Sequence, residues 1–435
     1  MADKMKPRIL SGFMELLPKE QILFNKMYDT IREVYESFGF LPLDTPVIEL
    51  SEILLAKAGG ETEKQIYRFT KGDNDLSLRF DLTVPLARYV AQHYGDLVFP
   101  FKRYQMSKVY RGERPQKGRF REFYQCDIDI IGNDELSLVY DAEMPAVIYN
   151  VFKKLDFGKF TVRINNRKIL NGFFSSLGLS DKISDILRTI DKIEKIGREN
   201  VEKELAEFEI STGDIKKILD FVSIGGSNDE KTEALKKLGV DNEMFCEGVK
   251  EIEEVCGYMR NFGIEESYFT IDLTIARGLD YYTGTVYETV LDDYRELGSV
   301  CSGGRYDNLT EFYTKQKLPG IGISIGLTRL FSQLIDKKII SAEEIGLVDV
   351  LVVPMDEINS YVLNAADKIR EAGLKTDVYY GSKGMKQKMK YADKCGIAYA
   401  AIIGEDEEKG KYITVKNMRN GEQKQVSLDD IKNAF

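Results

Sequence analysis

The sequence predicts an α+β protein: a main domain built on antiparallel strands, interrupted by helices, and followed by a separate α/β domain. Two alternating segments joined by a short basic turn predict a β-hairpin at residues 102–131. Residues 171–262 are rich in Glu, Lys, Ile and Leu, and their apolar positions recur at helical spacing. From residue 346 onward, apolar strand-like runs alternate with amphipathic helices, a pattern typical of a compact α/β domain.

These patterns predict four segments. Residues 1–170 and 263–338 form the two parts of the main domain, and residues 171–262 form a helical insertion between them. Residues 346–435 form the C-terminal domain, with strands near residues 348–353, 375–380 and 398–403 and helices between them.

Composition excludes several classes of protein. The chain has 435 residues and a formal net charge of −10, with enough apolar residues for a large core. No apolar run reaches the roughly 18 residues that a membrane helix needs, and the N-terminus lacks the pattern of a secretory signal. The five cysteines are scattered and form no CxxC pair. We therefore expect a cytoplasmic protein without a membrane segment.

The single histidine restricts the chemistry. His93 is the only residue that could serve a Ser-His-Asp or Cys-His mechanism, and the sequence around it predicts the end of a helix. A metal site made of several histidines is impossible. Arginine, lysine and carboxylate side chains must therefore carry the chemistry, and they suit phosphates better than acyl hydrolysis.

The predicted hairpin has one unusual face. Alternation in its return strand places four polar or aromatic side chains on one side, namely Phe123, Gln125, Asp127 and Asp129. The first strand contributes Arg111 and Glu113, and the turn at residues 114–119 is basic. Such a hairpin offers guanidinium groups to phosphate and carboxylates to an ammonium group. A solvated, salt-bridged face is the alternative.

Three later segments strengthen the ligand-binding interpretation. Residues 276–288 contain Arg277 on a glycine-flanked loop, and residues 302–307 repeat an arginine–tyrosine pair beside two glycines. Residues 320–330 form a glycine-punctuated strand that leads into a helix with Arg329 in its first turn. Glycines in a strand allow a ligand to approach the backbone. The chain has no GxxxxGK[ST] segment, which argues against a P-loop fold.

Together these segments resemble the class II aminoacyl-tRNA synthetases, in the form found in histidyl-tRNA synthetases. RGERPQKGRFREFYQ at residues 111–125 resembles motif 2, FLPLDTP at residues 40–46 resembles motif 1, and GIGISIGLTRL at residues 320–330 resembles motif 3. RGLDYY at residues 277–282 and SGGRY at residues 302–306 resemble the two histidine-specific motifs. The resemblance implies an antiparallel-sheet catalytic domain and a C-terminal anticodon-binding domain.

The resemblance also implies roles for individual residues. The implied ATP-binding residues are Arg111, Glu113, Arg119, Phe123 and Arg329, with Phe123 and Arg329 on the two faces of the adenine. The implied histidine-binding residues are Asp81, Thr83, Gln125, Asp129, Tyr282 and Tyr306. Arg277 and Arg111 would act in catalysis beside the α-phosphate. In many bacterial members a glutamate occupies the position of Asp81, and Asp129 also replaces a glutamate.

Further expectations concern ions and partners. Mg²⁺ should accompany ATP as a substrate ion, without a tightly bound protein metal. Motif 1 implies a homodimer. For tRNA(His), we expect Gln116 and Arg121 to meet the acceptor end and Lys386 and Lys388 to meet the anticodon stem, although a solvated helix start also explains the lysines.

Two alternatives share this fold. One is a non-catalytic paralogue that serves as a regulatory subunit of ATP phosphoribosyltransferase, and such paralogues have eroded motifs and usually lack the C-terminal domain. The other is a sensor of uncharged tRNA, which would need a kinase domain that this sequence does not contain.

Overall fold

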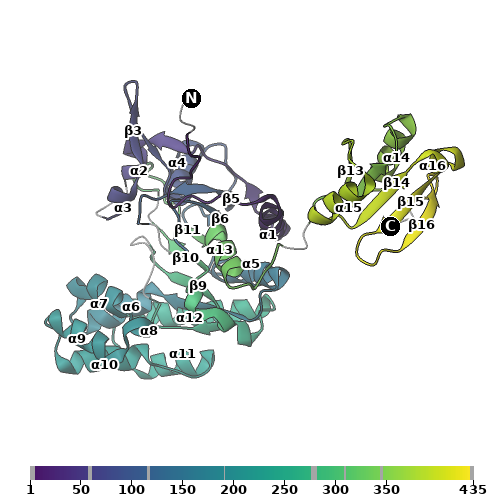
Figure 1. Ribbon diagram of the computed structural model, residues 1–435. Helices are drawn as coiled ribbons and strands as arrows, with labels where there is room; N and C mark the ends of the chain where they lie inside the picture. The colour runs from purple at the N-terminus through teal and green to yellow at the C-terminus, as the bar shows by residue number, and fades with distance from the viewer. Residues whose placement is uncertain are drawn as a thin grey trace. The chain divides into compact units, whose positions relative to one another are not determined.

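An eight-stranded, mainly antiparallel sheet organises the larger part of the chain (Figure 1). The computed structural model describes residues 5–56, 61–114, 118–190, 192–275, 282–307, 310–342 and 346–431. The chain divides into two compact units, Met1–Met14 with Tyr28–Ile339 and Glu15–Met27 with Ile340–Phe435. Helix α1 spans Pro18–Ser37. No helix in the described ranges is long and apolar enough to cross a membrane.

The large sheet has the strand order β1-β5-β6-β11-β10-β9-β7-β8. Its strands are β1 (Leu41–Pro42), β5 (Phe101–Tyr110), β6 (Glu122–Ile131), β7 (Phe160–Asn166), β8 (Phe269–Ile271), β9 (Thr285–Leu291), β10 (Cys301–Tyr306) and β11 (Gly320–Ile325). Of the described strand pairs in this sheet, only the two outer ones, β1–β5 and β7–β8, run parallel. The predicted antiparallel architecture is confirmed.

Strands β5 and β6 form the predicted hairpin. Their register pairs Arg103 with Asp129 and Val109 with Phe123. Cys126, Ile128 and Ile130 are fully buried, and alternate residues of β6 point to the opposite face. Helix α13 (Leu327–Asp336) packs against β6, and α5 (Val139–Leu155) packs against β7 and β11. The helices cover one face and leave the other to the polar residues.

The predicted helical insertion lies between the parallel neighbours β7 and β8. Its helices are α6 (Arg167–Ser176), α7 (Ile183–Ile190), α8 (Ile193–Ile196), α9 (Arg198–Glu207), α10 (Thr212–Val222), α11 (Asn228–Lys237) and α12 (Glu243–Asn261). Ser227 begins α11 with a capping box to Glu230, directly after Gly225 and Gly226. Helices α6 and α12 can approach closely because Gly248 has no Cβ. A Cβ at this position would lie 2.8 Å from the Ile169 nitrogen.

A small sheet and short helices complete the N-terminal part. The sheet has the order β2-β4-β3, made from β2 (Ile48–Leu50), β3 (Arg68–Lys71) and β4 (Asn74–Leu78). The short helices are α2 (Ser51–Leu55), α3 (Glu61–Gln65) and α4 (Thr83–Gln92). His93 is the C-cap of α4, as the sequence predicted.

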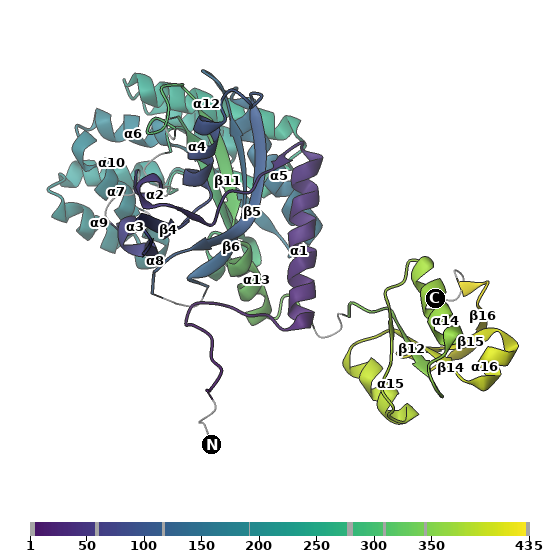
Figure 2. The same cartoon turned by 90° about the horizontal axis from the view of Figure 1, so that it is seen from above.

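The C-terminal unit has the predicted alternation of strands and helices (Figure 2). Its elements are β12 (Val350–Pro354), α14 (Ser360–Glu371), β13 (Thr376–Val378), α15 (Met385–Lys394), β14 (Tyr399–Ile403), α16 (Glu405–Gly410), β15 (Tyr412–Asn417) and β16 (Gln423–Ser427). Strands β13, β12 and β14 run parallel, and β15 and β16 extend the sheet antiparallel. The buried valines of β12 explain the apolar run in the sequence.

A buried ion pair joins α5 to the sheet. The Asp141 carboxylate is completely buried, and the Arg305 Nε of β10 lies 3.1 Å from each of its oxygens. Asp141→Ala leaves this guanidinium uncompensated, so the free energy of unfolding should fall by about 3–5 kcal/mol. Glu253→Ala is the matched control, since its solvent-exposed pair with Lys236 should contribute little to stability. Urea unfolding followed by circular dichroism measures both, and equal losses would contradict the assignment.

Candidate functional site

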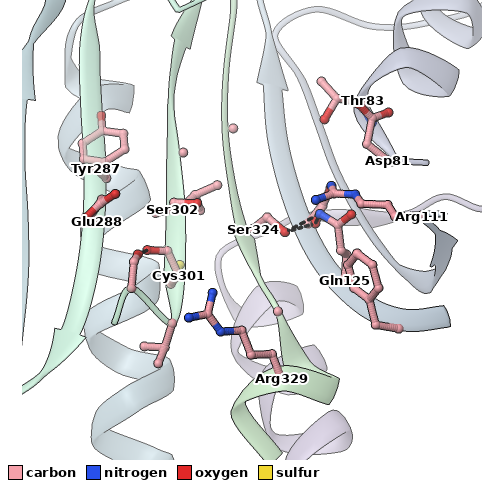
Figure 3. Close-up of a pocket in the computed structure, with 18 of the residues that line it drawn as sticks. Asp81, Thr83, Arg111, Gln125, Tyr287, Glu288, Cys301, Ser302, Ser324 and Arg329 are labelled. Carbon is pink, nitrogen blue, oxygen red and sulfur yellow. Dashed lines mark hydrogen bonds between the residues drawn. The ribbon is translucent and has the colours of Figure 1, made fainter. Parts of the chain in front are cut away.

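The exposed face of the hairpin forms one wall of a 720 Å³ cavity (Figure 3). The other walls come from the start of α4, strands β9, β10 and β11, and the start of α13. Every described residue predicted to bind ATP or histidine lines this cavity: Asp81, Thr83, Arg111, Glu113, Arg119, Phe123, Gln125, Asp129, Tyr282, Tyr306 and Arg329. Arg277 and Gln116 lie outside the described residues.

Three arginines and an aromatic ring gather at one side of the cavity. The Arg111 guanidinium lies 5.1 Å from the centroid of the Phe123 ring, and its Nε donates to the Phe80 carbonyl at 3.0 Å. Arg119 Nη1 donates to Glu113 Oε2 at 3.0 Å. Arg329 Nη2 is held by the Leu297 carbonyl at 2.9 Å. This side of the cavity can bind a polyanion and a flat ring.

Three buried carboxylates also line the cavity, and one of them, Asp81, lies near Arg111. Asp81, Asp127 and Asp129 have exposed fractions of 4%, 3% and 3%. Asp81 Oδ1 accepts the backbone N–H groups of Val84 at 3.0 Å and Thr83 at 3.2 Å, which ties this carboxylate to the first turn of α4. Burial raises the pKa of Asp81, while these backbone donors and Arg111 oppose the rise.

Asp129 is held from two strands. Its Oδ2 lies 2.6 Å from Arg103 Nη2 of β5, and its Oδ1 accepts a hydrogen bond from Tyr306 Oη of β10 at 2.7 Å. Burial raises the pKa of Asp129, and the Arg103 guanidinium and the Tyr306 hydroxyl limit the rise. The carboxylate therefore has a fixed orientation in the cavity wall.

Asp127 is bound to a neighbouring hydroxyl. Ser324 of β11 donates to its Oδ1, and Gln125 Nε2 donates to the same serine at 2.9 Å (Figure 3). Burial is the largest influence on Asp127 and raises its pKa to about 7, against the lowering effect of Arg103. Near neutral pH this side chain is therefore partly protonated.

The glycines of β11 keep the wall open. A Cβ on Gly322 would lie 2.0 Å from Asp129 Oδ1, and a Cβ on Gly320 would lie 2.3 Å from Cε2 of Tyr306. Any larger residue at either position would displace the carboxylate or the tyrosine. This steric requirement explains why glycines recur along the strand.

Three functional side chains escaped the sequence analysis. Strand alternation predicted the correct hairpin face for Asp127, but no function was predicted for it. No function was predicted for Arg103 or Ser324. Arg103 could have been found, because strand alternation puts it on the same face as Arg111 and opposite Asp129. Nothing in the sequence distinguishes Ser324 from the other small residues of β11 as a functional residue.

The residues predicted to contact tRNA fall in different surroundings. Arg121 does not line the cavity; its Nε donates to the Glu113 carbonyl at 3.1 Å. Lys386 is exposed on α15. Lys388 is buried, with an exposed fraction of 5%, and donates to the Pro354 carbonyl at 2.5 Å. Two positions on a helix differ by about 200°, so Lys388 points inward where Lys386 points outward. We therefore remove Lys388 from the expected tRNA contacts.

The pKa of Asp127 predicts a pH-dependent stability. Its ordinary value is 3.8 and its folded value is about 7, so the destabilisation due to its charge is absent below about pH 4 and complete above about pH 7. Asp127→Asn should therefore raise the free energy of unfolding at pH 8, by at most about 4 kcal/mol, and less at lower pH. Thermal melts at pH 5 and pH 8 measure this effect, with the partly exposed Asp185→Asn as control. A gain that is equal at both pH values would contradict the buried charge.

Comparison with known proteins identifies the family. The profile of the family described as histidyl-tRNA synthetase matches residues 12–330, and that of the anticodon binding domain matches residues 349–435. A protein named histidine–tRNA ligase from Clostridium tetani (strain Massachusetts / E88) is 59% identical over 437 residues, which cover 99% of each chain. Its namesake from Clostridium acetobutylicum (strain ATCC 824) is 47% identical and covers 99% of this chain and 100% of its own.

Solved structures agree with the sequence relatives. The crystal structure of histidyl-tRNA synthetase from Nostoc sp. PCC 7120 superposes with a TM-score of 0.91 at 43% identity and covers 99% of this chain and 100% of its own. An ATP phosphoribosyltransferase regulatory subunit/histidyl-tRNA synthetase from Bacillus halodurans C has a TM-score of 0.77 at 20% identity, with coverage of 93% and 99%, so it shares the fold. From the family profile and the full-length relatives, we conclude that the chain belongs to the histidyl-tRNA synthetase family.

Proposed function

We propose that this protein is a histidine–tRNA ligase. It joins L-histidine to ATP, giving histidyl-adenylate and pyrophosphate, and then transfers the histidyl group to the 3′ end of tRNA(His). The observation that carries the proposal is the combination, in one cavity, of cationic and aromatic groups with three buried carboxylates. The cationic and aromatic groups suit ATP, and the carboxylates suit an amino acid with an ammonium group and a side-chain N–H.

Histidine binds at the carboxylate side. Asp81, Thr83 and Gln125 receive the α-ammonium group, since Asp81 Oδ2 has no hydrogen bond to a described residue while Oδ1 is occupied by the backbone. Asp129 and Tyr282 bond the imidazole nitrogens. Tyr306 lies against the bound amino acid and orients Asp129. Asp127 adds a second negative charge near the ammonium site.

ATP binds at the cationic side. Arg111 holds the α-phosphate, Arg119 reaches the γ-phosphate, and Glu113 accepts the adenine amino group. The adenine ring takes a place against Phe123, and Arg329 covers its other face. Binding there requires the Arg111 guanidinium to leave the Phe123 ring and Arg119 to leave Glu113, both contacts of exposed or half-buried groups. Mg²⁺ enters with ATP as its counter-ion and neutralises the pyrophosphate.

The reaction needs no protein nucleophile. A carboxylate oxygen of histidine attacks the α-phosphorus, the bond to the bridging oxygen breaks, and pyrophosphate leaves with that electron pair. The ribose 3′-hydroxyl of the tRNA then attacks the histidyl carbonyl and AMP leaves. Arg111 and Arg277 stabilise the charge on the α-phosphate. The role of Arg277 rests on the family resemblance.

The remaining parts serve tRNA and assembly. Residues 346–435 bind the anticodon stem, with Lys386 in contact, and residues 171–262 interrupt the catalytic domain formed by residues 1–170 and 263–338. Arg121 supports the motif 2 turn at which Gln116 meets the acceptor end.

Exposed apolar side chains around motif 1 and the small sheet form a homodimer interface: Leu41, Val47, Ile48, Leu50 and Phe69. The protein works in the cytoplasm, where its substrates occur.

ATP–pyrophosphate exchange tests the function directly. We expect exchange with L-histidine and background rates with the other amino acids, because Asp129 and Tyr282 are proposed to bond the two nitrogens of an imidazole ring, which no other amino acid carries. Exchange with no amino acid would instead favour the regulatory paralogue, which shares the fold.

Asp129→Asn tests the imidazole contact. The substitution replaces a charged acceptor by a neutral amide, and charged hydrogen bonds contribute about 1.5–3 kcal/mol. The KM for histidine in the exchange assay should therefore rise by roughly 10-fold to 150-fold, while the KM for ATP changes little. Parallel increases in both constants would make Asp129 a structural residue.

Arg277→Ala tests the proposed fixed cation. Adenylate formation should slow by about 10²–10³-fold, as for the loss of an oxyanion donor. Arg277→Lys should recover only part of the rate, because an ammonium group lacks the guanidinium fork. Single-turnover transfer from preformed histidyl-adenylate is the control and should suffer less. A stable Arg277→Ala protein with near-normal activation would rule out the catalytic role.

A further inference from the structure

Arg103 is a buried arginine placed behind the carboxylate side of the cavity. Its side chain has an exposed fraction of 0%, and it does not line the cavity itself. Its Nη2 makes the 2.6 Å ion pair with Asp129 Oδ2 and lies 3.4 Å from the Leu82 carbonyl. Among the described residues, its Nε and Nη1 have no hydrogen-bond partner.

Such an arginine is a poor stabilising element. Removing a guanidinium from water is costly, and one ion pair with two unbonded donors returns only part of that cost. A well-packed apolar pair would commonly serve the fold as well. We therefore attribute the positive charge at this position to the function of the cavity and not to the stability of the fold.

The charges around Arg103 indicate what that need is. Three buried carboxylates of the described residues face the cavity, and Arg103 pairs with only Asp129. Asp81 is bonded to backbone N–H groups, and Asp127 to Ser324. Arg103 therefore compensates mainly the carboxylate with which it pairs directly, although its charge also lowers the pKa of Asp127, and two carboxylates without an ion pair to Arg103 are left to attract a cation. A bound histidine carries one permanent cation, its α-ammonium group, while its imidazole is mostly neutral at pH 7.

We propose, on the basis of the histidine-binding role assigned above, that Arg103 is a positioning residue for imidazole recognition. It keeps Asp129 ionised and fixes its orientation, so that this carboxylate accepts the N–H of a neutral imidazole and does not compete for the ammonium group. Arg103 acts through Asp129 and does not touch the substrate.

The electrostatics of Asp129 agree with this role. The groups that face it are Arg103 from β5, Asp127 from its own strand, Tyr306 from β10 and Asp81 from the turn before α4; Gly322 of β11 adds no charge. Burial and Asp81 raise its pKa, and Arg103 is the largest influence that lowers it. Loss of Arg103 should therefore leave Asp129 protonated up to a higher pH.

Two substitutions test the proposal in histidine-dependent ATP–pyrophosphate exchange. Arg103→Met should raise the KM for histidine at pH 7 at least about tenfold and change the KM for ATP less than about twofold. The ratio of the variant's KM for histidine to that of the wild type should shrink as pH rises from about 6 to about 8.5, because Asp129 regains its charge. Arg103→Lys keeps the charge and should restore most of the affinity at pH 7.

Controls separate positioning from folding. Arg79→Met removes another buried arginine, one bonded to the Lys108 and Thr45 carbonyls, and should cause no selective rise in the KM for histidine. If Arg103→Met alone does not fold, the double variant Arg103→Met with Asp129→Asn removes both charges; it should fold and have the same high KM for histidine as Asp129→Asn alone, because Arg103 acts through Asp129.

The outcomes are distinct from those of the function itself. A wild type that shows no histidine-dependent exchange would contradict the proposed function. With an active wild type, the Arg103 proposal is overturned by an unchanged KM for histidine, by equal rises for histidine and ATP, or by a KM ratio that is constant in pH or shrinks toward low pH. A folded double variant with the wild-type KM for histidine would also overturn it.

Discussion

The burial of carboxylates on the β5–β6 hairpin is the constraint on which the site depends. Charged groups are stable in such an environment only if neighbours compensate them. Three strands and the start of α4 supply that compensation, through Arg103 and Tyr306 for Asp129, Ser324 for Asp127 and backbone N–H groups for Asp81. The sheet order β5-β6-β11-β10 is what brings these partners together, so the topology of the fold and the charge pattern of the site are one arrangement.

Two parts of the cavity, at different positions along the hairpin, hold their side chains in different ways. Near the turn, the Arg111 guanidinium lies over the Phe123 ring and Arg119 pairs with the half-buried Glu113, and a bound nucleotide can replace both contacts. Deeper in the sheet, the carboxylates are fixed by short bonds to buried groups. A site of this kind can rearrange around a large, flexible nucleotide while it holds a small amino acid in one geometry. This difference agrees with the needs of a ligase that must discriminate histidine strictly and bind ATP transiently.

Sequence reasoning located much of this arrangement, because the relevant signals are local. Strand alternation placed Phe123, Gln125, Asp127 and Asp129 on one face, and helical spacing identified the insertion and α13. Ser324 was missed because its role arises from pairing between strands that are distant in sequence, whereas Arg103 lies opposite Asp129 in the predicted hairpin and was overlooked. Lys388 was assigned wrongly. Lysines at the start of a helix are usually solvated, but the Lys388 side chain is buried and donates a hydrogen bond to the Pro354 carbonyl. Motif resemblance supplied the roles that periodicity alone left open.

Proton release on histidine binding is the most direct test of the buried-carboxylate account. The pKa of Asp127 is about 7, so this side chain is partly protonated at neutral pH, and an ammonium group placed beside it should drive the proton off. Calorimetric titration with histidine at pH 7, in buffers of different ionisation enthalpy, should show net proton release, most of which disappears in Asp127→Asn. Proton uptake, or no exchange of protons with the wild type, would contradict the account.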